Sequence, residues 1–334
     1  MPKAMNIVED LLYNAVPDEE ILNNLKNDLL KERADAKLNQ GRCFSALQSY
    51  IFLGADYIKN TTLTDEQIKN LTSEELLGKI RDLMSCTHEA CYYGPATTND
   101  VTTLLTENHK IAETLKPLEK SIPVALSTPS SKVYMAQYDA KQIYYLQYSN
   151  EEEEKLDIAS DPYVRLYNEY FGGGMNAIVF QEMREARGLA YSASARLLEP
   201  EHKDDSYKYF AFIATQNDKM QTAIINDMPE SEAAFNIAKE ALITSIRTQR
   251  ITGRGILSSY RNTREMGLTE HRAKKIYEVL PTLTLEDVKA AQDKWVEGRT
   301  YHYGILGDIK DLDTKYLRTL GPVTTLSLEE IFGY

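Results

Sequence analysis

The sequence is poor in residues that would hold the fold together covalently. It contains three cysteines in 334 residues, which is too few for a disulfide framework. Cys86 and Cys91 lack the spacing of a zinc ribbon or a redox pair. We therefore expect Cys43, Cys86 and Cys91 to be small buried side chains.

Long apolar runs and an excess of basic residues are also missing. No run approaches the ~18 apolar residues that a membrane-spanning helix needs, so no membrane span is expected. The first residues, Met-Pro-Lys-Ala-Met-Asn, lead directly into an acidic amphipathic pattern, which is unlike a signal peptide. Fifty Asp and Glu against 38 Lys and Arg give a net charge of −12. Nucleic acid is therefore excluded as a partner, because phosphate binding needs a basic stripe.

The patterns of the common catalytic centres are absent as well. None of the five histidines lies three to five residues from another, and neither H-E-x-x-H nor H-x-x-E-H occurs. There is no G-x-S-x-G and no papain-like cysteine setting. We expect no metal site and no catalytic residue of this chain's own, and each histidine is expected at the surface or in ordinary packing: His88, His109, His202, His271 and His302.

What the sequence does contain is typical of a globular protein of about two domains, with 43% hydrophobic and 26% charged residues. Tyrosine is enriched, with 22 Tyr against 8 Phe and 1 Trp, and it suits half-buried sheet faces and cavity walls. Helical periodicity dominates the first hundred residues. Pro17-Asp18-Glu19-Glu20 predicts a helix start, because proline suits the first turn and the acids favour its positive end, and Thr64-x-x-Gln67 and Thr72-x-x-Glu75 predict two more. Ile21, Leu22, Leu25 and Leu29 form one apolar stripe.

Strands are expected in several places after that helical region. A short strand is predicted over 88–93, and a β-hairpin over 132–138 and 142–148, which flank Asp139-Ala140-Lys141. The acidic run 151–154 predicts the first turn of a helix that ends at Gly172. Further strands are predicted over 189–198, 207–215 and 299–306, the last of these being the final long strand.

A weak internal repeat relates the first hundred residues to the last hundred. Its paired landmarks are Gly41-Arg42 with Gly253-Arg254, Tyr50 with Tyr260, Leu71-Thr72 with Leu283-Thr284, and Tyr93-Gly94 with Tyr303-Gly304. The offsets are 253−41 = 212, 260−50 = 210, 283−71 = 212 and 303−93 = 210. Such a near-constant separation predicts duplication of a unit of about 210 residues. The second unit would begin near residue 120, so the first would begin about 90 residues before Met1. We therefore expect the chain to be part of a longer protein.

The most informative segment is Phe171 to Ala193, FGGGMNAIVFQEMREARGLAYSA. Its three glycines suit a hinge with close backbone approach better than a phosphate cradle, since they lack the spacing of either phosphate motif. Arg184 falls late on a predicted helix, and Tyr191 begins the next strand among small residues. A guanidinium and a phenol held together can donate hydrogen bonds to a peptide carbonyl. In the simpler alternative, Arg184 pairs with a nearby carboxylate and Tyr191 packs against Leu189 and Ala193.

The same run resembles the signature of the C-terminal type of domain in the pitrilysin/insulinase family of zinc peptidases, whose zinc motif is an inverted H-x-x-E-H. The resemblance implies an α+β fold with an antiparallel or mixed sheet backed by helices. It implies that residues 1–115 are the helical back half of a preceding related domain, and that 116–334 are one complete, non-zinc peptidase-like domain. By the same resemblance, Arg184 and Tyr191 would bind the substrate carbonyl, as the family's Arg and Tyr do from across a closed chamber.

The partners and cofactor follow from that resemblance. Zinc is expected in an N-terminal half that this chain lacks, in the same parent chain or in a partner subunit, and the substrate is expected to be an unfolded peptide. Two alternatives remain open: a catalytically inactive scaffold or partner subunit of the same family, and a peptide-binding module that captures strands at a sheet edge. No compartment is assigned, because cytoplasm and periplasm both suit the sequence.

Overall fold

The computed structural model describes residues 2–118, 124–173, 177–186, 188, 190–223 and 228–334. Its first part is helical, as predicted, and the predicted capping boxes form at Thr64 and Thr72, which each accept a backbone N–H of the following turn. The helix expected to open at 17–20 begins at Glu19, where Asp18 accepts the Ile21 N–H as its cap. The helices are α1 (Pro2–Asn14), α2 (Glu19–Lys37), α3 (Gln40–Thr61), α4 (Asp65–Asn70), α5 (Ser73–Leu83) and α6 (Thr98–Asn108).

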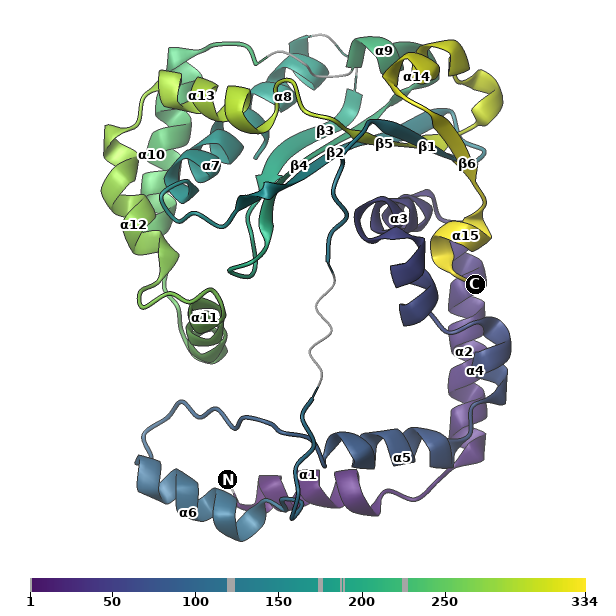
Figure 1. Ribbon diagram of the computed structural model, residues 1–334, viewed down its shortest axis with the longest axis vertical. Helices are drawn as coiled ribbons and strands as arrows, with labels where there is room; N and C mark the ends of the chain where they lie inside the picture. Colours follow the sequence, from purple (N-terminus) through teal and green to yellow (C-terminus); the bar gives the residue numbers. More distant parts are fainter. Residues whose placement is uncertain (1, 119–123, 174–176, 187, 189, 224–227) are drawn as a thin grey trace.

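A six-stranded mixed sheet forms the centre of the second part (Figure 1). The strands lie in the order β3-β4-β2-β5-β1-β6, where β1 pairs in parallel with β5 and β6 and the other pairs are antiparallel. This confirms the predicted α+β class with a mixed sheet. The strands are β1 (Lys132–Gln137), β2 (Gln142–Lys155), β3 (Ala190–Leu198), β4 (Ser206–Gln216), β5 (His302–Gly307) and β6 (Val323–Leu326).

Two predictions, a β-hairpin and a helix start, were wrong because pairing with distant strands decides the structure of these segments. The expected hairpin does not form: β5 lies between β1 and β2 and pairs with both. The expected helix start at 151–154 is instead the end of β2, which follows β4 as far as the pair Lys155 and Ser206. A local preference for a helix cap is weaker than a ladder of backbone hydrogen bonds.

Two further predictions about strands were wrong: one strand was expected where none forms, and one strand was missed. Residues 88–93 form no strand in the described structure, where the only pairing nearby is an isolated bridge between Cys86 and Lys116. The prediction also ended the sheet at β5, whereas β6 follows it at the sheet edge. Of the three cysteines expected to be buried, Cys43 is buried, Cys86 is half-buried and Cys91 is exposed.

Strand β4 divides two cores, one on each face of the sheet. Tyr207, Tyr209 and Ala211 face a large core under the helical layer, while Phe210 and Phe212 face a smaller one, as the alternation predicted. Helices α7, α10, α13 and α14 cover the first face, and α3 and α15 lie against the second (Figure 1). The second-part helices are α7 (Asp161–Tyr167), α8 (Ile178–Phe180), α9 (Met220–Ala223), α10 (Glu232–Thr248), α11 (Arg254–Glu265), α12 (Arg272–Val279), α13 (Leu285–Trp295), α14 (Thr314–Leu320) and α15 (Leu328–Phe332).

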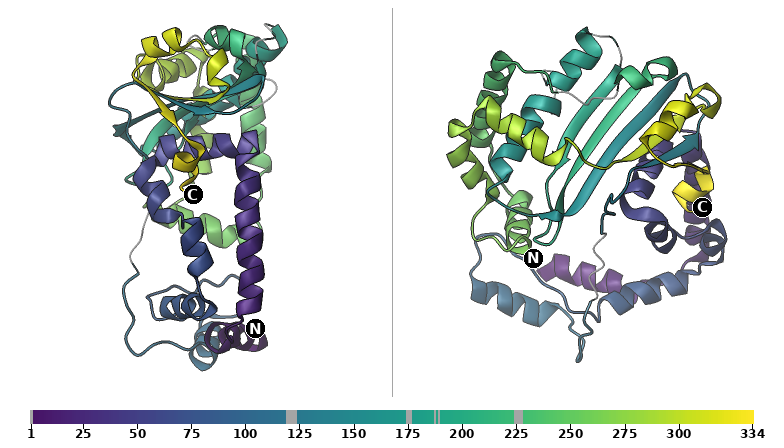
Figure 2. Two further views of the ribbon diagram at one scale, coloured as in Figure 1. Left: turned by 90° about the vertical axis from the view of Figure 1, so that its right-hand side faces the viewer. Right: turned by 45° about the horizontal axis from the view of Figure 1, so that its top comes forward.

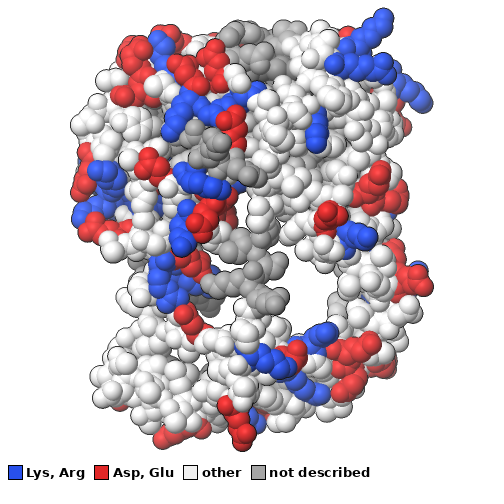
Figure 3. Space-filling model, in the orientation of Figure 1, with Lys and Arg blue, Asp and Glu red and all other residues white. Residues whose placement is uncertain are grey.

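Helix α3 joins the two parts of the molecule. Its buried Phe44, Leu47 and Ile51 pack in the smaller core with Leu146 of β2 and Leu306 of β5. Helices α1, α5 and α6 lie well away from the sheet (Figures 1 and 2). The space-filling view shows the molecule hollowed between the sheet layer and these lower helices (Figure 3). Among the described residues, none of the helices combines the length and the hydropathy of a membrane-spanning segment.

Candidate functional site

The glycine run brings a helical turn onto the backbone of β3. A π-helical turn, η1 (Asn168–Gly172), follows α7 and packs against this strand. A Cβ atom on Gly172 would overlap the carbonyl oxygen of Ala195 and lie 2.8 Å from its nitrogen. No other residue fits there, so the prediction of close backbone approach is confirmed at Gly172.

The same turn covers part of the outer edge of the sheet. The Asn168 side chain donates to the Leu197 carbonyl at 2.8 Å and accepts from the Leu197 N–H at 2.7 Å. These two bonds take the place of a neighbouring strand beside β3, which is an edge strand. An incoming peptide therefore cannot extend the sheet at Ala195 and Leu197 without displacing η1.

Tyr191 lies where β3 departs from regular pairing. Ala190 pairs with Thr215 and Ser192 with Ala214, so Tyr191 is the extra residue of a bulge. Regular alternation with the buried Ala193, Ala195 and Leu197 would turn Tyr191 toward the helix-covered core. Its side chain is instead 71% exposed. The bulge thus presents the phenol at the surface, unlike the alternative in which Tyr191 is packed away.

Arg184 precedes Tyr191 on a second π-helical turn, η2 (Gln181–Ala186), which packs against β3. The Arg184 side chain lies outside the described residues, as does Leu189. The predicted pairing of the guanidinium with the phenol therefore stays a prediction. What the structure gives is the short connection from η2 to the bulge at Tyr191.

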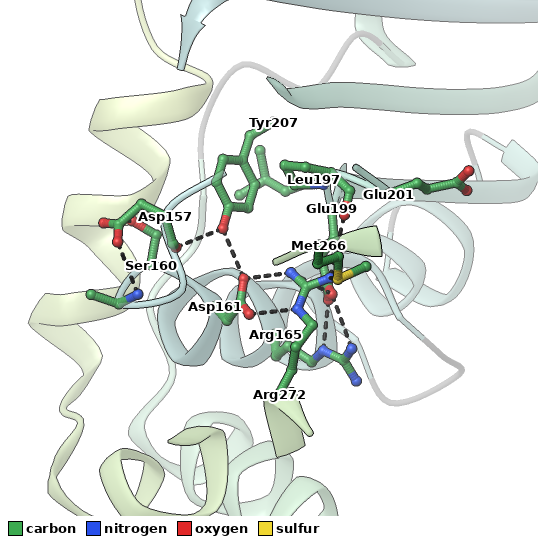
Figure 4. A network of polar contacts seen from close by, with 12 residues as sticks. Asp157, Ser160, Asp161, Arg165, Leu197, Glu199, Glu201, Tyr207, Met266 and Arg272 are labelled. Atoms are coloured by element: carbon green, nitrogen blue, oxygen red, sulfur yellow. Dashed lines mark hydrogen bonds and ion pairs between the residues drawn. The ribbon is translucent and has the colours of Figure 1, made fainter. Parts of the chain in front are cut away.

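A buried ion-pair network at the other end of β3 was not predicted (Figure 4). Asp161 of α7 is fully buried and accepts two hydrogen bonds of 2.6 Å from Arg272 of α12, and one of 2.8 Å from the Tyr207 hydroxyl. Glu199 accepts from Arg165 at 2.9 Å and lies 3.3 Å from Arg272. The network ties α7 and α12 to the sheet. Its members are too far apart in sequence for spacing to reveal them.

The charges of this network shift the pKa values of its members. Burial alone would lower the pKa of the Arg272 guanidinium, but the hydrogen bonds and charges of Asp161 and Glu199 outweigh it and raise that pKa. Burial and the Asp161 charge raise the pKa of the Tyr207 phenol well above its usual value. The Arg272 guanidinium therefore stays charged and the Tyr207 phenol neutral at neutral pH. The network serves packing, since its members are closed by their own partners.

Metal-binding groups do not gather in the described part of the chain, where no three His, Cys, Asp or Glu side chains could hold one ion. His88 and His109 do meet, with 2.7 Å between their Nε2 atoms, and His109 Nδ1 lies 2.5 Å from Glu9. Two ligand nitrogens so close leave no room for an ion between them. His302 is buried in β5, and burial together with the charge of Lys132 lowers its pKa to about 4.

Comparison with known proteins shows which solved structures share this fold. No family model and no curated protein matches the sequence. Among solved structures, the chain is similar to a peptidase M16 inactive domain from Pseudomonas fluorescens (TM-score 0.62, 16% identity, 87% of this chain and 71% of that one). It is also similar to the ferredoxin protease FusC in complex with Arabidopsis ferredoxin (0.65, 11%, 92% and 34%) and to complex III2 from Candida albicans (0.59, 16%, 96% and 79%).

These likenesses confirm the resemblance at the level of fold. The chain has the fold of M16 peptidase domains, and the pitrilysin/insulinase-type architecture predicted from the run at 171–193 is correct. The chain spans about a third of the FusC chain. One of the parallels is described as an inactive domain.

Proposed function

We propose that this chain is the C-terminal, non-zinc half of a zinc metallopeptidase, in which it forms one wall of the chamber and positions an unfolded peptide substrate. The proposal rests on the M16 fold together with the Tyr191 phenol, which the bulge in β3 holds at the surface. No three side chains among the described residues could hold one zinc ion. The proposal therefore assigns the metal to the other half and no step through it to this chain.

Within that peptidase, Tyr191 and Arg184 would act on the substrate carbonyl. A phenolic hydroxyl or a guanidinium aimed at the carbonyl oxygen donates a hydrogen bond that strengthens as negative charge develops there. Because Tyr191 lies on a β-strand, its phenol is attached to a rigid part of the backbone. Hydrogen-bond donors held in this way are effective because they need no reorganisation during the reaction.

The partner surface would lie on the helices of residues 1–115, which we propose are the back half of a preceding domain. Between α2, α4 and α5 there is an apolar cavity of about 510 Å³, whose walls include Leu25, Leu29 and Leu76. Leu25 is 60% exposed and Leu29 39% exposed. Apolar surface of this extent is typical of an interaction site, and the zinc-bearing half is its proposed occupant.

Activity of the reassembled enzyme tests the proposal. The chain should restore zinc-dependent peptide cleavage when mixed with its zinc-bearing half, and Tyr191→Phe should lower kcat roughly 10²- to 10³-fold. Tyr260→Phe is the matched control, since Tyr260 is also exposed, at 62%, but lies on α11. Unchanged turnover in Tyr191→Phe would remove the assigned role.

A second candidate is an inactive scaffold or partner subunit of the same fold. The inactive M16 domain and the complex III2 parallel favour it. In that case the chain would bind its partner half without restoring cleavage, and Tyr191→Phe would leave binding unchanged. Strand capture at the β3 edge is less favoured, because Asn168 and Gly172 already occupy that edge.

A further inference from the structure

A second cavity lies between helix α3 and the turn that joins β3 to β4. Its volume is about 640 Å³, which suits a peptide segment of a few residues. One wall is the α3 side chains Phe52 and Leu53, and the other is the stretch from Leu198 to Asp205. We call this cavity the β3–β4 groove.

The floor of the groove is apolar and held in place from below. Phe52 stacks on Tyr148 with ring centroids 4.1 Å apart and meets Phe210 edge-on at 5.7 Å. Leu198 and the exposed Val124 extend this apolar surface. Such a floor can accept the aliphatic part of a lysine or arginine side chain, or a neighbouring apolar side chain.

The rim of the groove is acidic, and only some of its carboxylates have a basic partner. Glu199 is bound by Arg165 and Arg272, and Asp205 holds Lys208 at 2.5 Å. The carboxylates of Glu199 and Asp205 therefore already have basic partners within the chain.

Glu201 and Asp204 differ from those paired residues. Both are exposed, and neither side chain makes a hydrogen bond or an ion pair within the described residues. In the close-up, the Glu201 carboxylate points away from the ion-pair network (Figure 4). Two uncompensated carboxylates thus stand over an apolar floor.

We infer that the β3–β4 groove binds a peptide segment that carries Lys or Arg beside an apolar residue. This inference rests on the proposed function, from which it takes the peptide nature of the substrate. Charge complementarity selects the cation at Glu201 and Asp204, and the Phe52 floor binds the apolar neighbour. The groove is the anchoring site for the substrate, apart from the reacting bond.

The length of β3 sets the reach of that anchor. Tyr191 and Leu198 are seven residues apart on the strand, which is about 23 Å at the usual rise of a strand. An extended peptide covers the same distance in about seven residues. A substrate anchored in the groove would therefore place the apolar residue that contacts Leu198 about seven residues from the bond next to Tyr191.

Binding to this chain alone tests the inference without the zinc-bearing half. The probe is a fluorescein-labelled peptide that contains a Phe-Lys-Lys segment, measured by fluorescence anisotropy. The double variant Glu201→Gln/Asp204→Asn should weaken binding roughly five- to thirty-fold, because two partly exposed ion pairs are lost. A probe with norleucine in place of both lysines should bind the unmodified chain as weakly as the probe binds this variant.

The matched control is the double variant Glu66→Gln/Glu107→Gln, which changes the net charge equally at exposed positions on α4 and α6. It should bind the probe as the unmodified chain does. Equal binding by the groove variant and the unmodified chain, or equal weakening by both double variants, would overturn the inference. If the groove does not bind the probe, the expected effect of Tyr191→Phe on kcat is unchanged. Failure of this inference can therefore be distinguished from failure of the proposed function.

Discussion

Helices α3 to α5 and α11 to α13 follow the same order of landmarks, but what comes after them differs. Gly41 and Gly253 stand at the starts of α3 and α11, and Thr72 and Thr284 cap α5 and α13 with capping boxes. After α13 comes β5, which lies between two strands; after α5, the corresponding residues 88–93 form no strand in the described structure. Similar sequence patterns thus give a strand only where partner strands are present.

The burial of apolar side chains shows the same contrast. Among the described residues, fifteen exposed large hydrophobic side chains lie in 2–118 and seven in 124–334. The only buried residues of α1 and α5 are Glu9 and Ser73, and α6 has none. The helices of the first part carry an apolar surface without the sheet that covers such surfaces in the second part.

Hydrogen exchange should show the largest difference between the two parts of the molecule. Amides of β2, β4 and β5 should exchange only on global unfolding, whereas those of α1, α5 and α6 should exchange through local opening, because these helices bury almost no apolar surface. We expect protection to differ by about 10³-fold or more. Mass spectrometry of peptic fragments measures it, and equal protection in the two sets would contradict the contrast. Adding the zinc-bearing half should raise protection in α1 and α5.

Leucine truncation tests the contrast one residue at a time. Leu47 on α3 is fully buried against the sheet, so Leu47→Ala should lower the free energy of unfolding by about 2–5 kcal/mol. Leu25→Ala on α2 should change it by less than about 0.5 kcal/mol, because Leu25 is 60% exposed. Urea denaturation followed by the fluorescence of Trp295, the only tryptophan, measures both. A large loss in Leu25→Ala would mean that its surface is covered in the chain itself.

The elements that sequence predicts correctly are the local ones. The caps at Thr64 and Thr72 depend on residues three positions apart, and the two faces of β4 depend on simple alternation. The helix expected at 151–154 and the hairpin expected after β1 failed, because ladders with β4 and β5 decided those segments. No local pattern could show that β5 would enter between β1 and β2.

The candidate site was predictable only in part, for the same reason. The small residues around Tyr191 and the glycine run marked the segment, and the close approach at Gly172 followed from the glycines. The bulge that exposes Tyr191 arises from its pairing with β4, and the groove beside Glu201 arises from the packing of α3 under the sheet. Both depend on contacts between residues far apart in the chain.

Two glycines should respond to the same substitution in opposite ways and so give the finest test of the contrast. Gly172→Ala should lower the urea midpoint seen at Trp295, at a cost of about 1–3 kcal/mol, because the added Cβ meets the Ala195 backbone. Gly78 lies inside α5, and a Cβ added there would meet no atom within 4 Å, so Gly78→Ala should favour that helix by about 0.5–1 kcal/mol. If α5 opens independently of the sheet, this gain should slow exchange of its amides about two- to five-fold and leave the Trp295 midpoint unchanged. A shift of that midpoint in Gly78→Ala would instead mean that α5 unfolds together with the sheet, so that the two parts of the molecule form one cooperative unit.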